Sequence, residues 1–526
     1  MIKARGKLHQ LGGATHGPHW AKFWLSVLGV MEWEAVNPVP PELWLLPDWA
    51  PIAPWRWWIH MRQVFLPMSY IYSKRFVAPL TPLTRQLREE LYTQSYESLD
   101  FASHRNSISI KDNFHPKTWV LNLINFLLVW LWFPYLRYES LVQRAEDWVW
   151  KLVQMEDANT DYADLGPVNA PMNTLCCFIH DGKDSHSFKR HIDRLNDYMW
   201  MNNEGMLMNG TNGVQVWDTA FLIQSVVEAG LAESPKWKPM LEKAAAFLED
   251  QQIPEEVPHQ SLCYRQSRKG AWPFSNKIQG YTVSDCTSEA LKATLQLQNL
   301  HHYPHLISEA RIHSAIDVLL TMQNPHSGGF ASYEPQRGSE LLEWLNAAEV
   351  FGRIMVEYDY PECTTAVVTV LSLFQNFSDY RAADIARIKE SAVRYIRRAM
   401  RADGSWYGSW GICFTYAAMF ALESLASVGE SYESSAQVRK GCEFLIAKQR
   451  EDGGWGEDYR SCEEKRYVQH ETSQVVHTAW ACIALMEAGY PEKGPLRRGL
   501  ALLLERQQRN GEWLQEGIEG VFNQSW

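Results

Sequence analysis

A short motif recurs along the second half of the chain, and it constrains the fold more than any other feature of the sequence. It consists of a glutamine, three residues, a glycine, one further residue and an aromatic ring. Complete copies are Gln266/Gly270/Trp272, Gln449/Gly453/Trp455 and Gln507/Gly511/Trp513; Gln323/Gly328/Phe330 has one inserted residue, and Met400/Gly404/Trp406 lacks the glutamine. The aromatic positions are 58, 76, 49 and 58 residues apart. Because such a distance holds two helices and their connections, each repeat is predicted to be a helical hairpin and the series a helical toroid.

The stretches around the motif have the spacing of apolar residues that amphipathic helices require. VRKGCEFLIAKQ and LRRGLALLLERQ show this spacing and lead into a polar turn with glycine. VVHTAWACIALMEAGY and CFTYAAMFALESLASVG are typical of partner helices that stop at a glycine. No strand-rich block is found, so we predict a nearly all-α fold from about residue 18 to the end.

Charge and cysteine content exclude several classes of protein. The 50 Lys and Arg against 61 Asp and Glu give a net charge of −11 without a dense basic run, which disfavours nucleic acid as a partner. Nine cysteines without a C-x-x-C pair disfavour a disulfide framework and a zinc knuckle, and favour a reducing compartment. The first residues are basic but lack the apolar core of a signal peptide, so secretion is not expected.

Residues 119–133, WVLNLINFLLVWLWF, contain only two polar side chains, Asn122 and Asn125. The run is shorter than the roughly 20 residues that span a bilayer. It therefore predicts either a buried core helix or a helix that lies in one face of a membrane, and the Trp and Tyr rings at its ends favour the membrane.

The strongest local candidate for chemistry is the run VSDCTSE, residues 283–289, directly before the apolar stretch ALKATLQLQ. Taken alone it is typical of a helix start, with an acidic residue at the cap and Glu289 in the first turn. The chain also has 24 Trp, 22 Tyr and 20 Phe, more rings than a core needs for volume. DCTSE, the repeats and the aromatic excess together make the chain similar to the oxidosqualene cyclases.

The resemblance extends over almost the whole chain. HWAKFWLSVLGV, GTNGVQVWDTAF, DGSWYGSWGICFTY and NGEWLQEGIEGVFNQS resemble family segments in family order, and Ser288 stands where the family usually has alanine. The implied fold is all-α, a double α/α-barrel of the triterpene cyclase type with one barrel incomplete. Residues 1–139 would hold the remnant of one barrel and the membrane-facing helix, and residues 140–526 the barrel with the repeats and the acid.

The resemblance implies that Asp285 is the general acid that protonates an epoxide. A carboxyl with a reference pKa of about 3.9 cannot do this at neutral pH, so the site must keep it protonated, which burial achieves. Cys286 and Cys363 match the thiols that orient this acid in the family. Without the resemblance, Cys363 is equally typical of a small buried apolar residue.

Further residues match the family's cavity. Aromatic faces stabilise a migrating cation without trapping it. The ring positions are Trp217, Phe274 and Trp410, the pair expected to end the reaction by deprotonation is His60 with Tyr333, and Trp58 and Trp20 match neighbours of that pair. Each ring alone is typical of packing, and a lone histidine is usually structural. Trp272, Trp455 and Trp513 of the repeats are expected to be structural.

The reaction implied is proton-initiated cyclisation and rearrangement of (S)-2,3-oxidosqualene to a tetracyclic triterpenol, with lanosterol the expected product and neither metal nor organic cofactor. The expected location is the cytosolic face of the endoplasmic reticulum or a lipid droplet, on one leaflet. A protostane-type product is an alternative. Both ends of the chain fall inside family segments, so a catalytically impaired, shortened cyclase is a second alternative.

Other enzymes with helical toroids fit less well. A glycosidase would need two carboxylates, for which Asp458 with Glu463 or Glu464 are the candidates, although a polar loop and a helix start explain them. A metal-dependent terpene synthase would need a D-D-x-x-D run, which is missing. A zinc prenyltransferase would need an Asp/Cys/His set, and the sequence shows none at convincing spacing.

Overall fold

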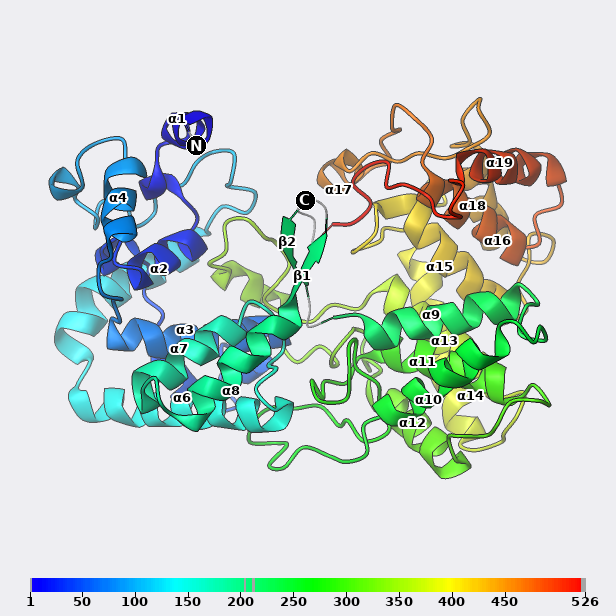
Figure 1. Cartoon of the computed structure of the whole chain (residues 1–526), viewed down its shortest axis with the longest axis horizontal. Helices are drawn as coiled ribbons and strands as arrows, with labels where there is room; N and C mark the ends of the chain where they lie inside the picture. The colour runs from blue at the N-terminus through cyan, green and yellow to red at the C-terminus, as the bar shows by residue number, and fades with distance from the viewer. Residues whose placement is uncertain (1, 203–204, 211–212, 522–526) are drawn as a thin grey trace. The chain divides into compact units, whose positions relative to one another are not determined.

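The computed structural model describes residues 2–202, 205–210 and 213–521, and it is mostly helical, as predicted. The chain divides into two compact units (Figure 1). The first consists of Met1–Gly210 with Arg337–Val356, and the second of Thr211–Gln336 with Glu357–Trp526. This division falls at Gly210 rather than after residue 139, because helix α6 packs against α3 and η3 of the first unit.

The first unit combines eight described α-helices with short helical turns and one antiparallel hairpin, β1–β2, in which Met199 pairs with Met208. Its α-helices and strands are α1 Ile2–Gln10, α2 His19–Val27, α3 Ile59–Lys74, α4 Pro82–Glu90, α5 Trp119–Leu127, α6 Glu139–Thr160, α7 Ala170–Asp181, α8 His186–Arg194, β1 Met199–Asn202 and β2 Gly205–Met208. The short turns include η3 Pro41–Leu45, η8 Glu340–Leu345 and the π-helical η6 Leu128–Leu136.

The second unit is a double row of helices. Its elements are α9 Gln215–Glu228, α10 Lys238–Gln251, α11 Ser284–Gln298, α12 Glu309–Thr321, α13 Pro361–Phe374, α14 Ala382–Ala399, α15 Cys413–Ser427, α16 Ala436–Ile446, α17 Arg460–Glu464, α18 Val475–Glu487 and α19 Lys493–Arg506. Helices α9, α11, α13, α15 and α18 pack side by side in one row, and α10, α12, α14, α16 and α19 pack on them. This is the architecture of an α/α-barrel, which the repeats predicted.

In the four repeats that carry a tryptophan, the indole ties its loop to the helix before it. The indole N–H of Trp272 donates to the Leu248 carbonyl at 2.8 Å, and that of Trp455 to the Leu445 carbonyl at 2.7 Å. Trp272, Trp406 and Trp455 are fully buried, whereas Trp513 in the last repeat is 44% exposed. The prediction that these rings serve the structure agrees with their contacts.

In two of the repeats the glutamine, Gln323 or Gln449, joins its own loop to the next helix of the outer row. Gln449 Nε2 donates to the Gly453 and Pro495 carbonyls, both at 2.8 Å. In the first repeat this position is taken by Gln252, which donates to the Gly270 and Arg311 carbonyls, and Gln266 instead donates to Thr321. The sequence spacing therefore assigned the wrong glutamine to this repeat, because the loop before Gly270 is longer than in the other copies.

Glycine is required in the repeats for two physical reasons. Gly453 has a φ of +90° in the left-handed region, and a Cβ there would lie 2.5 Å from the Cβ of Arg498 in α19. Gly270 likewise abuts the backbone of Ser314 in α12. Gly511 has a φ of +93° but no described atom near the Cβ position. The motif thus permits close approach of successive hairpins.

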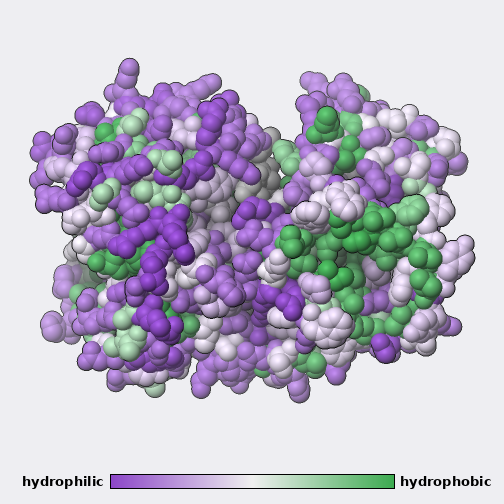
Figure 2. Space-filling view, turned by 180° about the vertical axis from the view of Figure 1, so that it is seen from behind, coloured by the Kyte–Doolittle hydropathy of each residue, from purple (hydrophilic) through white to green (hydrophobic). Residues whose placement is uncertain are grey.

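Residues 119–133, predicted as one helix, form the start of a longer apolar stretch, α5 followed by η6. Trp119–Leu136 is the one described helical stretch long and apolar enough to cross a membrane, by length and composition alone, and 11% of it is buried. Figure 2 shows a broad apolar area on the part of the surface that the first unit occupies. Exposed large apolar side chains from this stretch include Trp119, Phe126, Trp130 and Tyr135.

Candidate active site

The acid motif forms the first turn of α11, and the neighbouring segment at residues 331–332 holds that turn in place. Ser284 donates from its backbone N–H to the Ser332 carbonyl at 2.7 Å and from its hydroxyl to the Ala331 carbonyl at 2.6 Å. Almost every residue of α11 is buried, because helices pack against it on several sides. Asp285 is consequently only 4% exposed.

Two donors contact the Asp285 carboxyl. The backbone N–H of Cys286 donates to Oδ1 at 3.0 Å, and the Cys363 thiol at the start of α13 lies 3.6 Å from Oδ2, where it donates. Burial raises the pKa of Asp285 to about 6, although these donors favour the ionised form. The site therefore holds a carboxyl with a much larger neutral fraction near pH 6 than an exposed aspartate has.

The two cysteines predicted to orient the acid contribute differently. Cys363 contacts Asp285 through its thiol, which also lies 3.4 Å from the Ser332 hydroxyl. Cys286 contacts it through the backbone. Burial raises the pKa of both thiols well above the usual range, so both thiols are neutral and neither is an activated nucleophile.

A second buried acid, Glu362, lies next to Cys363 and was missed by the sequence analysis. It accepts a hydrogen bond from the Ser409 backbone N–H at 2.6 Å, and within the described chain its Oε2 has no partner. Burial raises the pKa of Glu362 to about 7, and the negative charge of Asp285 adds to this. Its position after Pro361 is typical of an ordinary helix start, so only its burial distinguishes it.

Aromatic side chains lie close to the two acids. Tyr333 is buried and makes an edge contact with Tyr281 at a centroid distance of 6.4 Å. Burial raises the pKa of Tyr333 and Tyr416 well above the usual range, and the charge of Asp285 adds to the effect in both. Tyr416 was not predicted. Both hydroxyls are therefore neutral at physiological pH.

The three predicted cavity rings make two separate contacts in this unit. Trp217 at the start of α9 lies 5.7 Å from Phe274, centroid to centroid, and its backbone N–H donates to the Phe274 carbonyl. Trp410 lies 4.6 Å from Tyr360, which directly precedes α13. All three predicted rings are half-buried. Each of these side chains is therefore partly exposed, unlike Trp272, Trp406 and Trp455 of the repeats.

The remaining predicted residues, His60, Trp58 and Trp20, belong to the first unit. His60 lies in the first turn of α3 with its ring 4.5 Å from that of Trp58, and burial lowers the pKa of His60 to about 4. The imidazole is therefore neutral at pH 7, as a proton acceptor must be. Trp58 is anchored by its backbone N–H on the Met355 carbonyl, and Trp20 stacks on Phe23.

The carboxylates considered for a glycosidase have structural partners. Asp458 accepts from the Arg460 guanidinium at 2.9 Å, and hydrogen bonds from Arg460 lower its pKa. Glu463 and Glu464 belong to the short helix α17. A lowered pKa is the opposite of what a glycosidase acid needs, so Asp458 does not fit that role.

A barrel of helical hairpins that holds a buried aspartate of raised pKa among aromatic rings has the groups that a protonation-initiated cyclase needs. Residues 1–204 match the N-terminal domain and residues 214–523 the C-terminal domain of squalene-hopene cyclases. The chain belongs to this family, which includes the oxidosqualene cyclases, and it is a terpene cyclase/mutase.

Individual relatives match the whole chain. It is 70% identical over 526 residues to a lanosterol synthase of Aspergillus fumigatus, with 100% of this chain and 70% of the relative covered. It is 49% identical over 523 residues to a terpene cyclase/mutase of a Nectria species, covering 99% and 71%, and 45% identical over 530 residues to human lanosterol synthase, covering 100% and 72%. The chain thus spans about seven-tenths of the length of these relatives.

Proposed function

We propose that the chain cyclises (S)-2,3-oxidosqualene to lanosterol, with Asp285 as the proton donor. The observation that carries the proposal is the burial of Asp285 beside the Cys363 thiol, which raises its pKa to about 6. An acid of this kind can protonate an epoxide oxygen that an aspartate in water would leave unprotonated. The relatives named lanosterol synthase, at 45–70% identity, support the substrate and the product.

Each group has a separate task in this mechanism. Asp285 gives its proton to the epoxide oxygen, and the Cys286 N–H and the Cys363 thiol stabilise the carboxylate left behind. The faces of Trp217, Phe274 and Trp410 stabilise the cation by about 0.5–2 kcal/mol each, more where water is absent. Removal of the last proton is assigned to His60, whose buried imidazole is neutral and lies 4.5 Å from the ring of Trp58. The roles of Tyr333 and Trp20 in that step rest on the resemblance alone.

The product class has one specific competitor. The terpene cyclase/mutase of Nectria is 49% identical to this chain, close to the 45% of human lanosterol synthase. A different tetracycle, such as a protostane-type triterpenol, needs the same acid and a different last deprotonation. Sequence identity of this degree therefore supports the initial protonation of the epoxide more strongly than the final deprotonation, which decides the product.

Incubation of the purified chain with detergent-dispersed 2,3-oxidosqualene, followed by mass spectrometry of the products, tests the proposal. Lanosterol supports it, and another tetracycle supports the reaction class but changes the product. A folded chain that leaves the substrate unchanged would favour the impaired cyclase instead. The Asp285→Asn variant controls for uncatalysed opening of the epoxide.

We also propose that Trp119–Leu136 contacts one leaflet of the endoplasmic reticulum or a lipid droplet from the cytosolic side. Thr118 caps α5 and donates to the Trp344 carbonyl at 2.6 Å, and Arg137 pairs with Glu42 at 2.5 Å. Both ends are thus fixed to the first unit while the apolar side chains between them are exposed. The nine free cysteines fit a reducing compartment. Sedimentation of the chain with phospholipid vesicles supports this proposal, and its absence contradicts it.

A further inference from the structure

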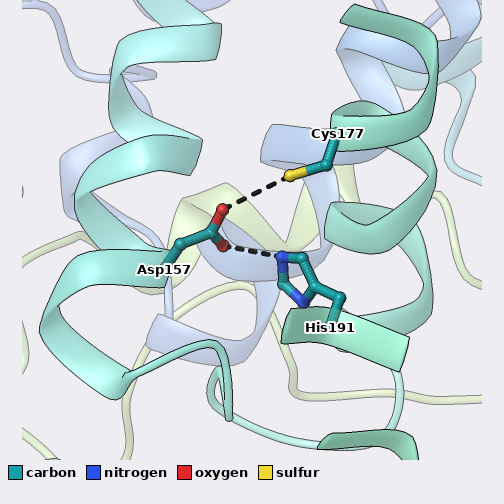
Figure 3. Close-up of side chains that lie close together, drawn as sticks. All are labelled: Asp157, Cys177 and His191. Carbon is teal, nitrogen blue, oxygen red and sulfur yellow. Dashed lines mark hydrogen bonds and ion pairs between the residues drawn. The ribbon is translucent and has the colours of Figure 1, made fainter. Parts of the chain in front are cut away.

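The first unit contains a buried cluster of potential metal ligands that the proposed reaction does not use. Asp157 at the end of α6, Cys177 in α7 and His191 in α8 direct their side chains toward one another (Figure 3). Their ligand atoms all lie within 4.8 Å of one another, and all three residues are buried. The three positions are 20 and 14 residues apart on separate helices, so no sequence spacing revealed them.

The contacts in this cluster are close but incompletely satisfied. His191 Nε2 lies 3.1 Å from Asp157 Oδ1, and the Cys177 Sγ lies 3.5 Å from Asp157 Oδ2. Within the described chain neither ring nitrogen of His191 has a partner in hydrogen-bond geometry, although the side chain is 1% exposed. The carboxylate oxygen is therefore near Nε2 but off the direction in which a ring N–H points. Buried donors and acceptors without partners are rare and require an explanation.

We propose that Asp157, Cys177 and His191 bind a single divalent transition metal ion of the zinc type, which ties α6, α7 and α8 together. Thiolate, imidazole and carboxylate form a ligand set typical of Zn²⁺. The site is enclosed, as structural zinc sites are. It is independent of the cyclisation chemistry proposed for Asp285.

The distances fit this ion. With bonds of about 2.0 Å to nitrogen and oxygen and about 2.3 Å to sulfur, the edges of a tetrahedral site are about 3.3 Å from N to O and about 3.5 Å from S to O. The observed separations are 3.1 Å from His191 Nε2 to Asp157 Oδ1 and 3.5 Å from Cys177 Sγ to Asp157 Oδ2, so an ion placed between the three side chains would face both carboxylate oxygens. The off-axis position of Asp157 Oδ1 is also expected, because in a metal site the ion, rather than a second ligand, lies along the nitrogen lone pair.

Residues around the three ligands are arranged as supporting groups. Asp164 Oδ2 lies 3.7 Å from His191 Nδ1, on the side of the ring away from Asp157, and has no hydrogen-bond partner within the described chain. The Asn173 amide fixes Asp164 by donating to its Oδ1 at 2.9 Å. In metal sites a carboxylate commonly accepts a hydrogen bond from the ring N–H of the bound histidine that does not face the metal. This contact fixes the tautomer in which Nε2 is free to bind the metal. Asp164 is therefore the expected positioning residue.

Two buried carboxyl groups, those of Asp157 and Asp164, face one imidazole, and no Lys or Arg contact to either is found among the described ion pairs. On binding, the metal–sulfur and metal–nitrogen bonds form while the thiol proton of Cys177, and any proton on Nε2, pass to solvent.

Titration of the chelator-treated full chain with Co²⁺ alone tests the proposal. We expect one Co²⁺ per chain, with the near-ultraviolet charge-transfer band of a cobalt–thiolate bond. Cys177→Ser should abolish that band, and Asp164→Asn should weaken binding by about 10- to 100-fold without abolishing it. Cys442→Ser, which removes an equally buried thiol from the second unit, is the matched control and should leave the titration unchanged.

A measurement on the unsubstituted chain guards against variants that fail to fold. Zn²⁺ alone should raise the Tm of the chelator-treated chain, and renewed chelation should reverse the rise. Absence of stoichiometric Co²⁺ binding, or a charge-transfer band that persists in Cys177→Ser, would overturn the proposal. A doubly protonated His191 in a chain that binds no metal would identify the cluster as an ion-paired imidazolium instead. None of these results depends on cyclase activity.

Discussion

Asp285 illustrates how one residue takes its chemistry from its surroundings. Its folded-state pKa of about 6 lies above the usual 3.8, so the neutral, proton-donating fraction falls as pH rises through 6. We predict that cyclisation slows about tenfold per pH unit above that value.

Asp285→Asn should reduce turnover by at least about 10³-fold while the helical circular dichroism is unchanged. A flat rate between pH 6 and 8, or an active Asn variant, contradicts the assignment.

The same pKa shift makes a prediction about stability. A carboxyl whose folded pKa is raised costs no stability below pH 3.8, and the cost grows as pH rises to about 6 and is then constant. At about 1.4 kcal/mol per unit, the full cost is about 3 kcal/mol. The Tm of Asp285→Asn relative to the unsubstituted chain should therefore rise between pH 4 and 7. A Tm difference that is independent of pH would show that the acid is not buried in solution.

The half-buried rings provide a test of cation stabilisation. Trp410→Ala removes a face beside Tyr360 without touching the acid. We predict that this variant still opens the epoxide but releases partly cyclised products, because the charge loses about 0.5–2 kcal/mol of stabilisation late in its path. Mass spectrometry of the products measures this. Tyr432→Ala, which removes an equally half-buried ring that packs on Tyr490, is the control that should keep the product ratio. If Trp410→Ala leaves the product ratio unchanged, the ring of Trp410 serves packing only.

Candidate site residues could be predicted from the sequence only where they belong to a recognisable motif. DCTSE located Asp285, and the resemblance located Cys363, but Glu362 and Tyr416 were missed because their neighbours are typical of ordinary helix residues. Their unusual pKa values come from burial by helices distant in sequence, which no local pattern encodes. The Asp157, Cys177 and His191 cluster escaped notice for the same reason, since three helices must first be packed.

At the scale of elements, the repeats were the most predictable part of the fold. Apolar spacing and the glycine stops located the helix pairs, and the motif aromatics pack as expected. The structure adds the reason for the motif, which is contact between a loop and the next outer helix. That contact also explains why Gln252 replaces Gln266: the partner is chosen by position in space and not by spacing along the chain.

Two glycines separate the contributions of backbone strain and close packing. Gly453 and Gly511 have nearly equal φ, +90° and +93°, but an added Cβ meets Arg498 only at Gly453 among the described residues. We predict that Gly511→Ala costs about 1–2 kcal/mol of unfolding free energy from the left-handed backbone alone. Gly453→Ala should lower the unfolding free energy by about 1–3 kcal/mol more than Gly511→Ala does, because the added methyl group overpacks the contact with α19. Urea unfolding measures both, and equal losses would contradict the role of the motif glycine in helix contact.

For the molecule as a whole, the apolar stretch Trp119–Leu136 decides whether the protein works in solution or on a lipid surface. Phe126 and Trp130 are 58% and 65% exposed. Because burial of one such side chain is worth about 1.5–3 kcal/mol, Phe126→Glu with Trp130→Glu should lower the partition coefficient onto phosphatidylcholine vesicles by at least about tenfold. The matched control is Leu83→Glu, which changes an apolar residue on α4 that is 64% exposed and should bind as before. Co-sedimentation gives both values. If the double variant binds vesicles as well as the control, the apolar stretch is not the membrane contact, and its exposed rings must have another partner.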